Sequence, residues 1–149
     1  MVVQLICLLN SMNSKQKGDL TELQVLTYLC SLGYKCSIPF GEDCDYDLIA
    51  DINHKLIRIQ VKTSSQKFKN NPNIFEFSCK RTGKNHRYTS QEIDYFGTYW
   101  NDKCYLIPIN ECSIAKTLHL VKPKSGQIKR INFASKYEAE KQLELLQKY

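Results

Sequence analysis

The chain has 149 residues, of which 42% are hydrophobic, and this length suits one domain, residues 1–149, with one core. Its formal net charge is +6, and no apolar run is long enough to cross a membrane, so we expect no membrane partner. The seven cysteines include no C-x-x-C pair and the three histidines are far apart in sequence, which argues against zinc. We expect reduced thiols and a cytoplasmic location.

The positive charge is concentrated in one segment of the chain. Seven of the 21 basic residues, but one of the 15 acids, lie between Lys62 and Tyr88, so the remainder of the chain is neutral. Such a concentration favours an anionic partner, nucleic acid first. A solvated lysine-rich loop is the ordinary alternative.

The first ten residues, "MVVQLICLLN", are apolar but lack the basic start and the small-residue cleavage site of a signal peptide. Met12 offers an alternative translation start just before a polar stretch. We therefore interpret residues 1–11 as a candidate N-terminal extension.

Helical spacing of apolar residues predicts a first helix over residues 15–32, with Gly33 as its stop. Glu22 precedes Val25, Leu26 and Leu29 by three, four and seven positions, so it shares a face with apolar side chains. An acid directed toward a core costs free energy unless it is paired. Glu22 is therefore either an edge residue that reaches water or part of a site.

Three strands follow, over residues 34–41, 42–52 and 56–64, and the last two form a hairpin around "NHK". In the third strand, Ile57, Ile59 and Val61 alternate with polar residues, so the two sets face opposite sides of the sheet. The apolar neighbouring strand favours a covered sheet, in which the polar face lines a cleft. That polar face consists of Arg58, Gln60 and Lys62.

The second half of the chain is predicted to be mixed. A capping-box spacing at Thr89 and Glu92 predicts a short helix that runs through residue 100, and Ser135 with Glu138 repeats the spacing before a C-terminal helix. Strands are expected at residues 73–81 and 104–109, and a basic hairpin at 117–123 and 127–133. The sum is an α/β fold: a mixed central sheet flanked by helices, with added basic β-hairpins.

These residues meet a known pattern. An acid on the first helix (Glu22), an aspartate leading a strand (Asp47), and a Q-x-K on its partner strand (Gln60, Lys62) resemble the PD-(D/E)xK nuclease superfamily from Gly18 onward. The stretches "DYDLIAD", "RIQVKTS" and "RYTSQEIDYFGTYWNDKCYLIPI" resemble the homing endonucleases encoded in cyanobacterial group I introns. The resemblance implies a restriction-endonuclease-like core and a site-specific, Mg²⁺-dependent endonuclease that cuts both strands of DNA.

The resemblance also implies roles for the residues, and the chemistry of phosphodiester hydrolysis agrees with them. Mg²⁺ prefers oxygen ligands, so Asp47, the Gln60 amide and the backbone carbonyl of Val61 are the candidate metal ligands, and Mn²⁺ should substitute. Lys62 would contact the scissile phosphate or the attacking water. The candidate catalytic residues are thus Glu22, Asp47, Gln60 and Lys62. We expect no organic cofactor.

Gln60 stands where the family pattern has an acid, and three accounts compete. Its amide oxygen can take the place of a carboxylate oxygen while supplying no negative charge. The site is then intact, with Glu22 restoring charge nearby; alternatively the protein is a catalytically silent DNA-binding protein, or the motif is accidental. We favour the first account, because the other three residues are all present.

Segments 66–88 and 121–132 are the candidate DNA-contacting hairpins, since basic side chains contact phosphates and two-stranded ribbons fit the major groove. Cutting both strands of double-stranded DNA with one small domain requires a homo-oligomer, a dimer or a tetramer. A Holliday-junction resolvase and a restriction-type nuclease are the alternative enzymes. The candidate DNA-binding residues are Lys67, Lys69, Lys80, Arg81, Lys84, Arg87, Lys122, Lys124, Lys129 and Arg130.

Overall fold

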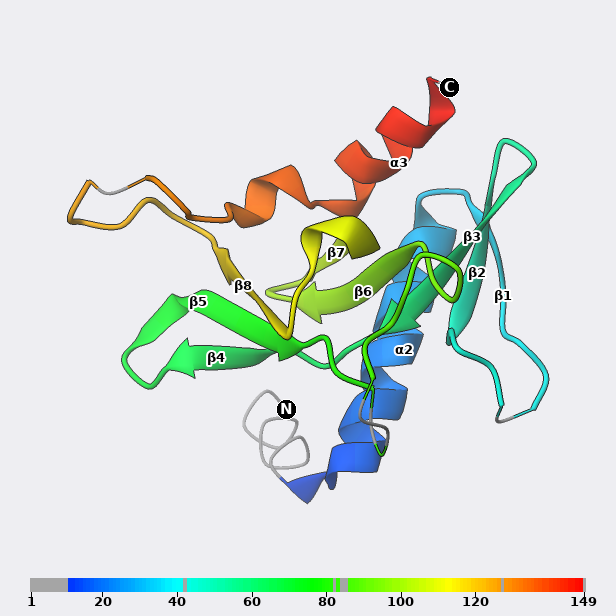
Figure 1. Ribbon diagram of the computed structural model, residues 1–149, viewed down its shortest axis with the longest axis horizontal. Coiled ribbons are helices and arrows are strands. Elements are labelled where there is room, and N and C mark those ends of the chain that lie inside the picture. Colours follow the sequence, from blue (N-terminus) through cyan, green and yellow to red (C-terminus); the bar gives the residue numbers. More distant parts are fainter. Residues whose placement is uncertain (1–10, 42, 82, 84–85, 127, 149) are drawn as a thin grey trace.

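The computed structural model describes residues 11–41, 43–81, 83, 86–126 and 128–148 (Figure 1). Two α-helices, α2 (Ser14–Ser31) and α3 (Ala139–Gln147), accompany eight strands in this part of the chain. Within the described ranges, neither helix combines the length and the apolar character that a bilayer crossing requires. The strands are β1 (Lys35–Ser37), β2 (Leu48–Ile52), β3 (Lys55–Val61), β4 (Ser65–Phe68), β5 (Asn71–Ser78), β6 (Tyr95–Trp100), β7 (Lys103–Pro108) and β8 (Ala115–His119).

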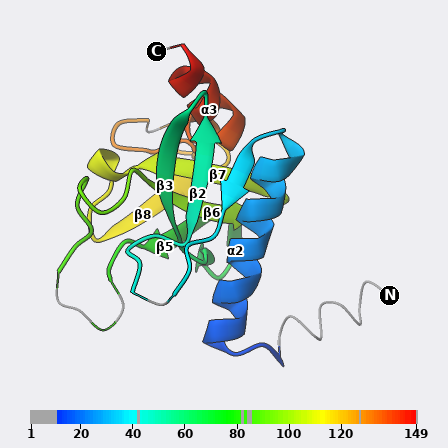
Figure 2. The same cartoon turned by 90° about the vertical axis from the view of Figure 1, so that its right-hand side faces the viewer.

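The strands form two sheets. The larger has the order β1-β2-β3-β6-β7, in which β3 and β6 are parallel and all other neighbours antiparallel. The smaller is the antiparallel sheet β4-β5-β8. Helix α2 runs along the larger sheet, and α3 lies at one end of the molecule (Figures 1 and 2). The predicted mixed α/β fold with a central sheet flanked by helices is confirmed.

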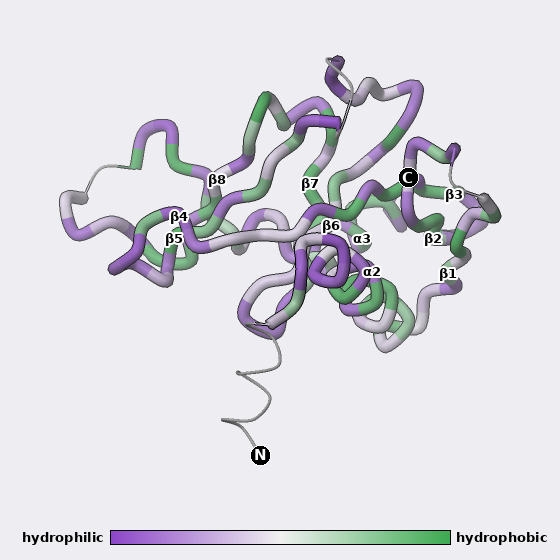
Figure 3. Tube along the Cα trace, turned by 90° about the horizontal axis from the view of Figure 1, so that it is seen from below, coloured by the Kyte–Doolittle hydropathy of each residue, from purple (hydrophilic) through white to green (hydrophobic). Residues whose placement is uncertain are grey.

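Two apolar clusters hold these layers together. On one face of the larger sheet, Val25 and Leu29 of α2 pack with Ile59 of β3. In the second cluster, Phe75 and other residues of β5 pack with residues of β6 and β7. Figure 3 shows the apolar residues gathered on the strands and α2, while the connecting turns are mostly hydrophilic. Burial against α2 on one side of β3 leaves its polar side chains facing the other way.

The hairpin β2–β3 forms as the sequence predicts. Its turn residues Asn53 and His54 have φ angles of 51° and 67°, which a two-residue hairpin turn requires. The backbone N–H of His54 donates to Oδ1 of Asp51 at 2.9 Å and closes the turn. This turn fixes the register in which Leu48 lies opposite Ile59, and hence the position of the residue before β2.

The prediction of a helix from Thr89 through residue 100 is wrong, because Tyr95–Trp100 forms strand β6. The local capping contact does exist: the backbone N–H of Thr89 donates to Oε2 of Glu92 at 2.7 Å. The chain leaves that turn at once, since the following run of aromatic residues and threonine favours a strand. Strand β6 then pairs in parallel with β3.

The prediction of a second basic hairpin, over residues 117–123 and 127–133, is also wrong. Strand β8 ends at His119 and pairs with β5, and the described residues of 121–132 contain no strand. A single bridge joins His119 to Phe133. The expected capping box of the last helix is wrong as well, because Ala134–Lys136 is a 3-10 turn and α3 begins at Ala139 without a side-chain cap. The first basic hairpin exists as β4–β5.

Candidate active site

Asp47 occupies the position just before β2, where that strand meets β3. Its backbone N–H donates to the carbonyl of Ile59 at 3.0 Å. Its carboxylate oxygen Oδ2 accepts two hydrogen bonds, from the backbone N–H of Val61 at 2.7 Å and from Nε2 of Gln60 at 2.5 Å. The pairing of β2 with β3 therefore brings the carboxylate of Asp47 onto the end of β3.

The amide of Gln60 lies between two oxygens. Besides its contact with Asp47, Nε2 lies 3.3 Å from the carbonyl oxygen of Val61. The atom of the Gln60 amide that faces these oxygens is therefore its nitrogen. We expected the amide oxygen there, as a metal ligand. The NH₂ group can donate to both oxygens, and so occupies the place between them that a cation could take. A rotation of the amide by half a turn would present its oxygen, Oε1, at that place instead. Gln60 is 9% exposed, so this contact is shielded from water.

A cavity of about 230 Å³ adjoins this group, between α2 and the start of β2. Three carboxylates and no basic side chain line it: Asp19 and Glu22 of α2, and Asp47. Burial raises the pKa of Glu22 to about 7, and the charges of Asp47 and Asp19 act in the same direction. Sequence reasoning missed Asp19, although its spacing of three residues from Glu22 places both on one helix face.

The buried setting of Asp47 makes its negative charge costly. Burial raises the pKa of this carboxyl above its usual range, and three smaller effects oppose it: the Val61 N–H, the charge of Lys62 and the Gln60 amide. A cation that binds beside a carboxylate in such a setting stabilises its charged form. Its hydrogen bonds also fix its orientation, as metal ligands are commonly fixed.

Lys62 follows β3 directly and is anchored through its backbone to β6. Its N–H donates to the carbonyl of Gly97 at 2.9 Å, and its carbonyl accepts from the hydroxyl of Thr98 at 2.7 Å. Burial lowers the pKa of the Lys62 ammonium group; the charge of Asp47 opposes this, and that of Arg81 adds to it. The structure therefore brings a half-buried cation close to the carboxylate.

The donor set fits a divalent metal that prefers oxygen. Among the described residues, no three His, Cys, Asp or Glu side chains converge as a metal site. A metal here would instead be held by Asp47, the carbonyl of Val61 and, after reorientation, the amide oxygen of Gln60. Mg²⁺ suits such a set, since it keeps several waters and needs one or two protein carboxylates.

The basic residues expected to contact DNA differ in their surroundings. Lys67 is paired with Glu76 at 2.8 Å, and Arg81 is paired with Asp45 and with Glu92 at 2.9 Å, so neither guanidinium nor ammonium is free in this state. Lys84 lies outside the described residues. The side chains of Lys69, Lys80, Arg87, Lys122, Lys124, Lys129 and Arg130 are exposed.

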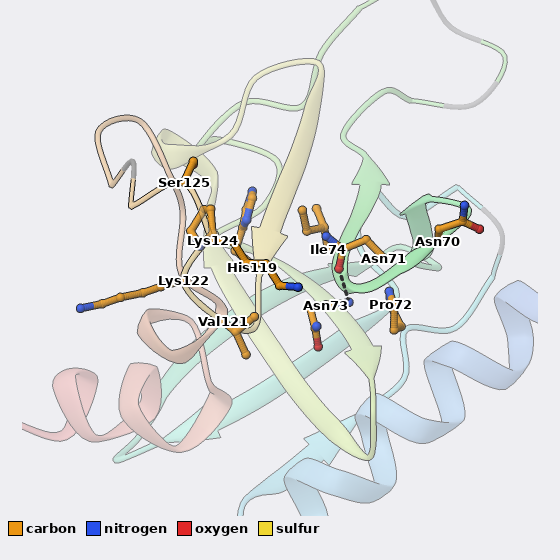
Figure 4. Close-up of a pocket in the computed structure, with 11 residues that line it drawn as sticks. Asn70, Asn71, Pro72, Asn73, Ile74, His119, Val121, Lys122, Lys124 and Ser125 are labelled. Atoms are coloured by element: carbon orange, nitrogen blue, oxygen red, sulfur yellow. Dashed lines mark hydrogen bonds between the residues drawn. The ribbon is translucent and has the colours of Figure 1, made fainter.

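The turn of the β4–β5 hairpin and the loop after β8 meet at one surface, although they are not paired as strands. They enclose a cavity of about 520 Å³. Figure 4 shows Asn71 and Asn73 on one side of it and His119 and Lys124 on the other, while Lys122 extends away from it. Amides and a lysine thus line a hollow at the end of the smaller sheet.

Comparison with known proteins agrees with this geometry. The family model of the PD-(D/E)XK endonuclease matches residues 12–140, so the chain belongs to this endonuclease family. Membership confirms the predicted resemblance and makes the chain a deoxyribonuclease of a family that generally uses divalent metal ions.

A solved structure described as that of a bacterial homing endonuclease, I-Ssp6803I, has the same fold with a TM-score of 0.68. The two chains are 20% identical, and the match covers 91% of this chain and 92% of the other. No curated protein sequence matches this chain. The solved structure therefore supports the fold across nearly the whole chain.

Proposed function

We propose that this protein is a Mg²⁺-dependent endonuclease that cuts both strands of DNA at a specific site, as a homing endonuclease does. The observation that carries the proposal is the grouping at the end of β3. There Oδ2 of Asp47 and the carbonyl of Val61 both face the amide of Gln60, and Lys62 is the next residue. The shared fold with I-Ssp6803I supports the homing assignment.

Each residue of the group has a distinct task. Asp47, the Val61 carbonyl and, after reorientation of its amide, Gln60 would hold the metal. A bound Mg²⁺ polarises a phosphoryl oxygen and lowers the pKa of a coordinated water. Lys62 directs its N–H donors at the scissile phosphate or the attacking water and stabilises the charge that develops there. Glu22 and Asp19, which line the same cavity as Asp47, would add negative charge beside a bound metal.

The smaller sheet provides the DNA-binding surface in this proposal. Its exposed lysines contact phosphates, which sets affinity and salt dependence. The amides of Asn71 and Asn73 at the hairpin turn can each pair with an adenine edge in the major groove. The cavity shared with Lys124 then receives the DNA backbone beside that turn.

Double-strand cutting requires more than one active site. One chain carries one Asp47–Lys62 group, so a homodimer or homotetramer would place two such groups on opposite strands. Sedimentation or light scattering of the protein with and without its target duplex determines the number of copies. A strict monomer that nicks one strand would contradict this part of the proposal.

The proposal is tested with a library of duplexes in Mg²⁺, in Mn²⁺ and in EDTA. We expect cleavage at a restricted set of sites with either metal and none in EDTA. Asp47→Asn should abolish cleavage, while the control Asp102→Asn, in the exposed β6–β7 turn where φ is 58°, should leave it unchanged. Full activity of Asp47→Asn would contradict the assignment. Tight binding without cutting would favour a silent DNA-binding protein, and preference for four-way junctions would favour a resolvase.

A further inference from the structure

The ring of Tyr88 lies close to two cations. The centroid of the ring is 5.2 Å from Nζ of Lys62 and 5.4 Å from Cζ of Arg81. The ring also packs on Phe96 in a T-shaped arrangement, with centroids 5.5 Å apart and planes at 88°. Phe96 is fully buried in β6. Tyr88 therefore joins the basic segment to the core next to the end of β3.

The second cation is itself held in place. The guanidinium of Arg81 pairs with Asp45 and with Glu92, the latter at 2.9 Å. Glu92 in turn accepts the backbone N–H of Thr89, the residue that follows Tyr88. The ring is thus packed against Phe96 and lies beside an arginine that two carboxylates hold.

The ammonium group of Lys62 has the ring of Tyr88 beside it and no charged or hydrogen-bonded partner among the described residues. Within residues 11–41, 43–81, 83, 86–126 and 128–148, its Nζ donates no hydrogen bond and forms no ion pair within 4.0 Å. A long lysine side chain in water samples many rotamers, and ordering it costs free energy. An aromatic face attracts an ammonium group by cation–π interaction. Unlike a carboxylate, the ring leaves the positive charge and all three N–H donors available to a phosphate.

We propose that Tyr88 is a positioning residue that holds the ammonium group of Lys62 beside Asp47 through its aromatic face. The inference rests on the role of Lys62 in the proposed function. It requires the ring and not the hydroxyl, because the attraction comes from the π face. It also gives Arg81 a structural task in place of the DNA contact expected from the sequence.

Kinetics of three substitutions at Tyr88 separate the role of the ring from that of the hydroxyl. Tyr88→Phe keeps the ring and should cut the target at close to the wild-type rate. Tyr88→Leu removes the ring and should lower kcat roughly 3- to 30-fold, with a much smaller change in KM. Tyr88→Met is a second apolar replacement without the ring, and it is measured if Tyr88→Leu does not fold. Equal losses in Phe and Leu variants would overturn the inference.

A double-mutant cycle tests whether Tyr88 acts through Lys62. In a Lys62→Met background, Tyr88→Leu should cause no further loss of kcat, since the group that the ring positions is gone. Independent, additive losses in the two variants would show that Tyr88 acts on something else and would overturn the inference.

An NMR measurement needs no cleavage at all. The ring current of Tyr88 should shift the Cε protons of Lys62 upfield, and Lys62→Met identifies that signal. The shift should persist in Tyr88→Phe and vanish in Tyr88→Leu. An unchanged signal in Tyr88→Leu would overturn the inference. Should the wild type fail to cut DNA while the shift behaves as expected, the proposed function fails and the contact itself stands.

Discussion

Nε2 of Gln60 lies 2.5 Å from Oδ2 of Asp47, so a neutral donor meets a buried carboxylate where the family pattern has a second acid. This hydrogen bond offsets part of the cost of burying the charge of Asp47. A glutamate at position 60 would instead place two carboxylates against each other, which raises the pKa of one of them. The glutamine therefore stabilises the metal-free state and weakens the attraction for a cation.

Gln60→Glu should accordingly make stability depend on metal. In EDTA at pH 8 we expect the variant to lose about 1–3 kcal/mol of unfolding free energy, from the repulsion and the lost hydrogen bond. Mg²⁺ should raise its melting temperature more than that of the wild type, and some cleavage should remain. Thermal unfolding with and without Mg²⁺ measures this. The exposed Gln91→Glu is the matched control; an equal response in both variants would contradict the account.

Glu22 predicts a pH dependence of stability. Its folded pKa of about 7 lies above its ordinary value of 4.5, so its contribution to stability is fully present below pH 4.5 and is lost as the pH rises through 7. Glu22→Gln should therefore match the wild type near pH 4.5 and exceed it at pH 8 in EDTA. We expect about 1–2 kcal/mol after allowance for solvent screening.

Urea unfolding at the two pH values measures this difference. Glu144→Gln, on the exposed side of α3, controls for the removal of one negative charge. Saturating Mg²⁺ should reduce the advantage of Glu22→Gln at pH 8, because a cation in the acidic cavity stabilises the carboxylate. An equal gain in stability at both pH values would show that Glu22→Gln stabilises the protein for reasons other than the lost charge.

The sequence predicted the first helix and the β2–β3 hairpin better than it predicted the elements of the second half of the chain. The alternation in β3 and the turn at Asn53 and His54 are local properties, and both were readable. Strand β6 was misassigned because the contact between Thr89 and Glu92 is also local, and yet the pairing that decides the next residues is with β3, far away in sequence. Parallel pairing leaves no signal in a short window.

Two features of the site also escaped the sequence for physical reasons. An amide has a donor and an acceptor end, and which end of Gln60 faces Asp47 depends on where the Val61 N–H and carbonyl lie in three dimensions. The contact of Tyr88 with Lys62 joins the basic segment to the end of β3, and a ring at such a separation reads as an ordinary core or interface residue. Spacing alone predicts neither contact.

Gly97, whose carbonyl accepts the backbone N–H of Lys62, lies where a larger side chain would clash. A Cβ at this position would lie 2.8 Å from Cγ2 of Ile59 and 3.4 Å from Cγ1 of Val25, between β6 and α2. Gly97→Ala should therefore destabilise the fold by about 1–3 kcal/mol. Gly18→Ala, in α2 with nothing within 4 Å of the new Cβ, should instead be neutral or stabilise by up to about 1 kcal/mol. Chemical denaturation of both variants checks the opposite signs, and stabilisation by Gly97→Ala would contradict the packing argument.

Lys124 and Arg81 should differ in how they affect DNA binding. Lys124 is exposed beside the hairpin turn, whereas the charge of Arg81 is already paired with Asp45 and Glu92. Lys124→Ala should weaken binding and reduce the slope of log K against log salt by about 1, the loss of one phosphate contact. Arg81→Ala should leave that slope nearly unchanged while lowering kcat through Tyr88. Fluorescence anisotropy in EDTA between about 50 and 200 mM salt measures the slopes. Lys148→Ala, at the C-cap of α3, is the control for charge alone, and a larger slope change for Arg81→Ala than for Lys124→Ala would mean that Arg81 leaves its carboxylates to bind a phosphate.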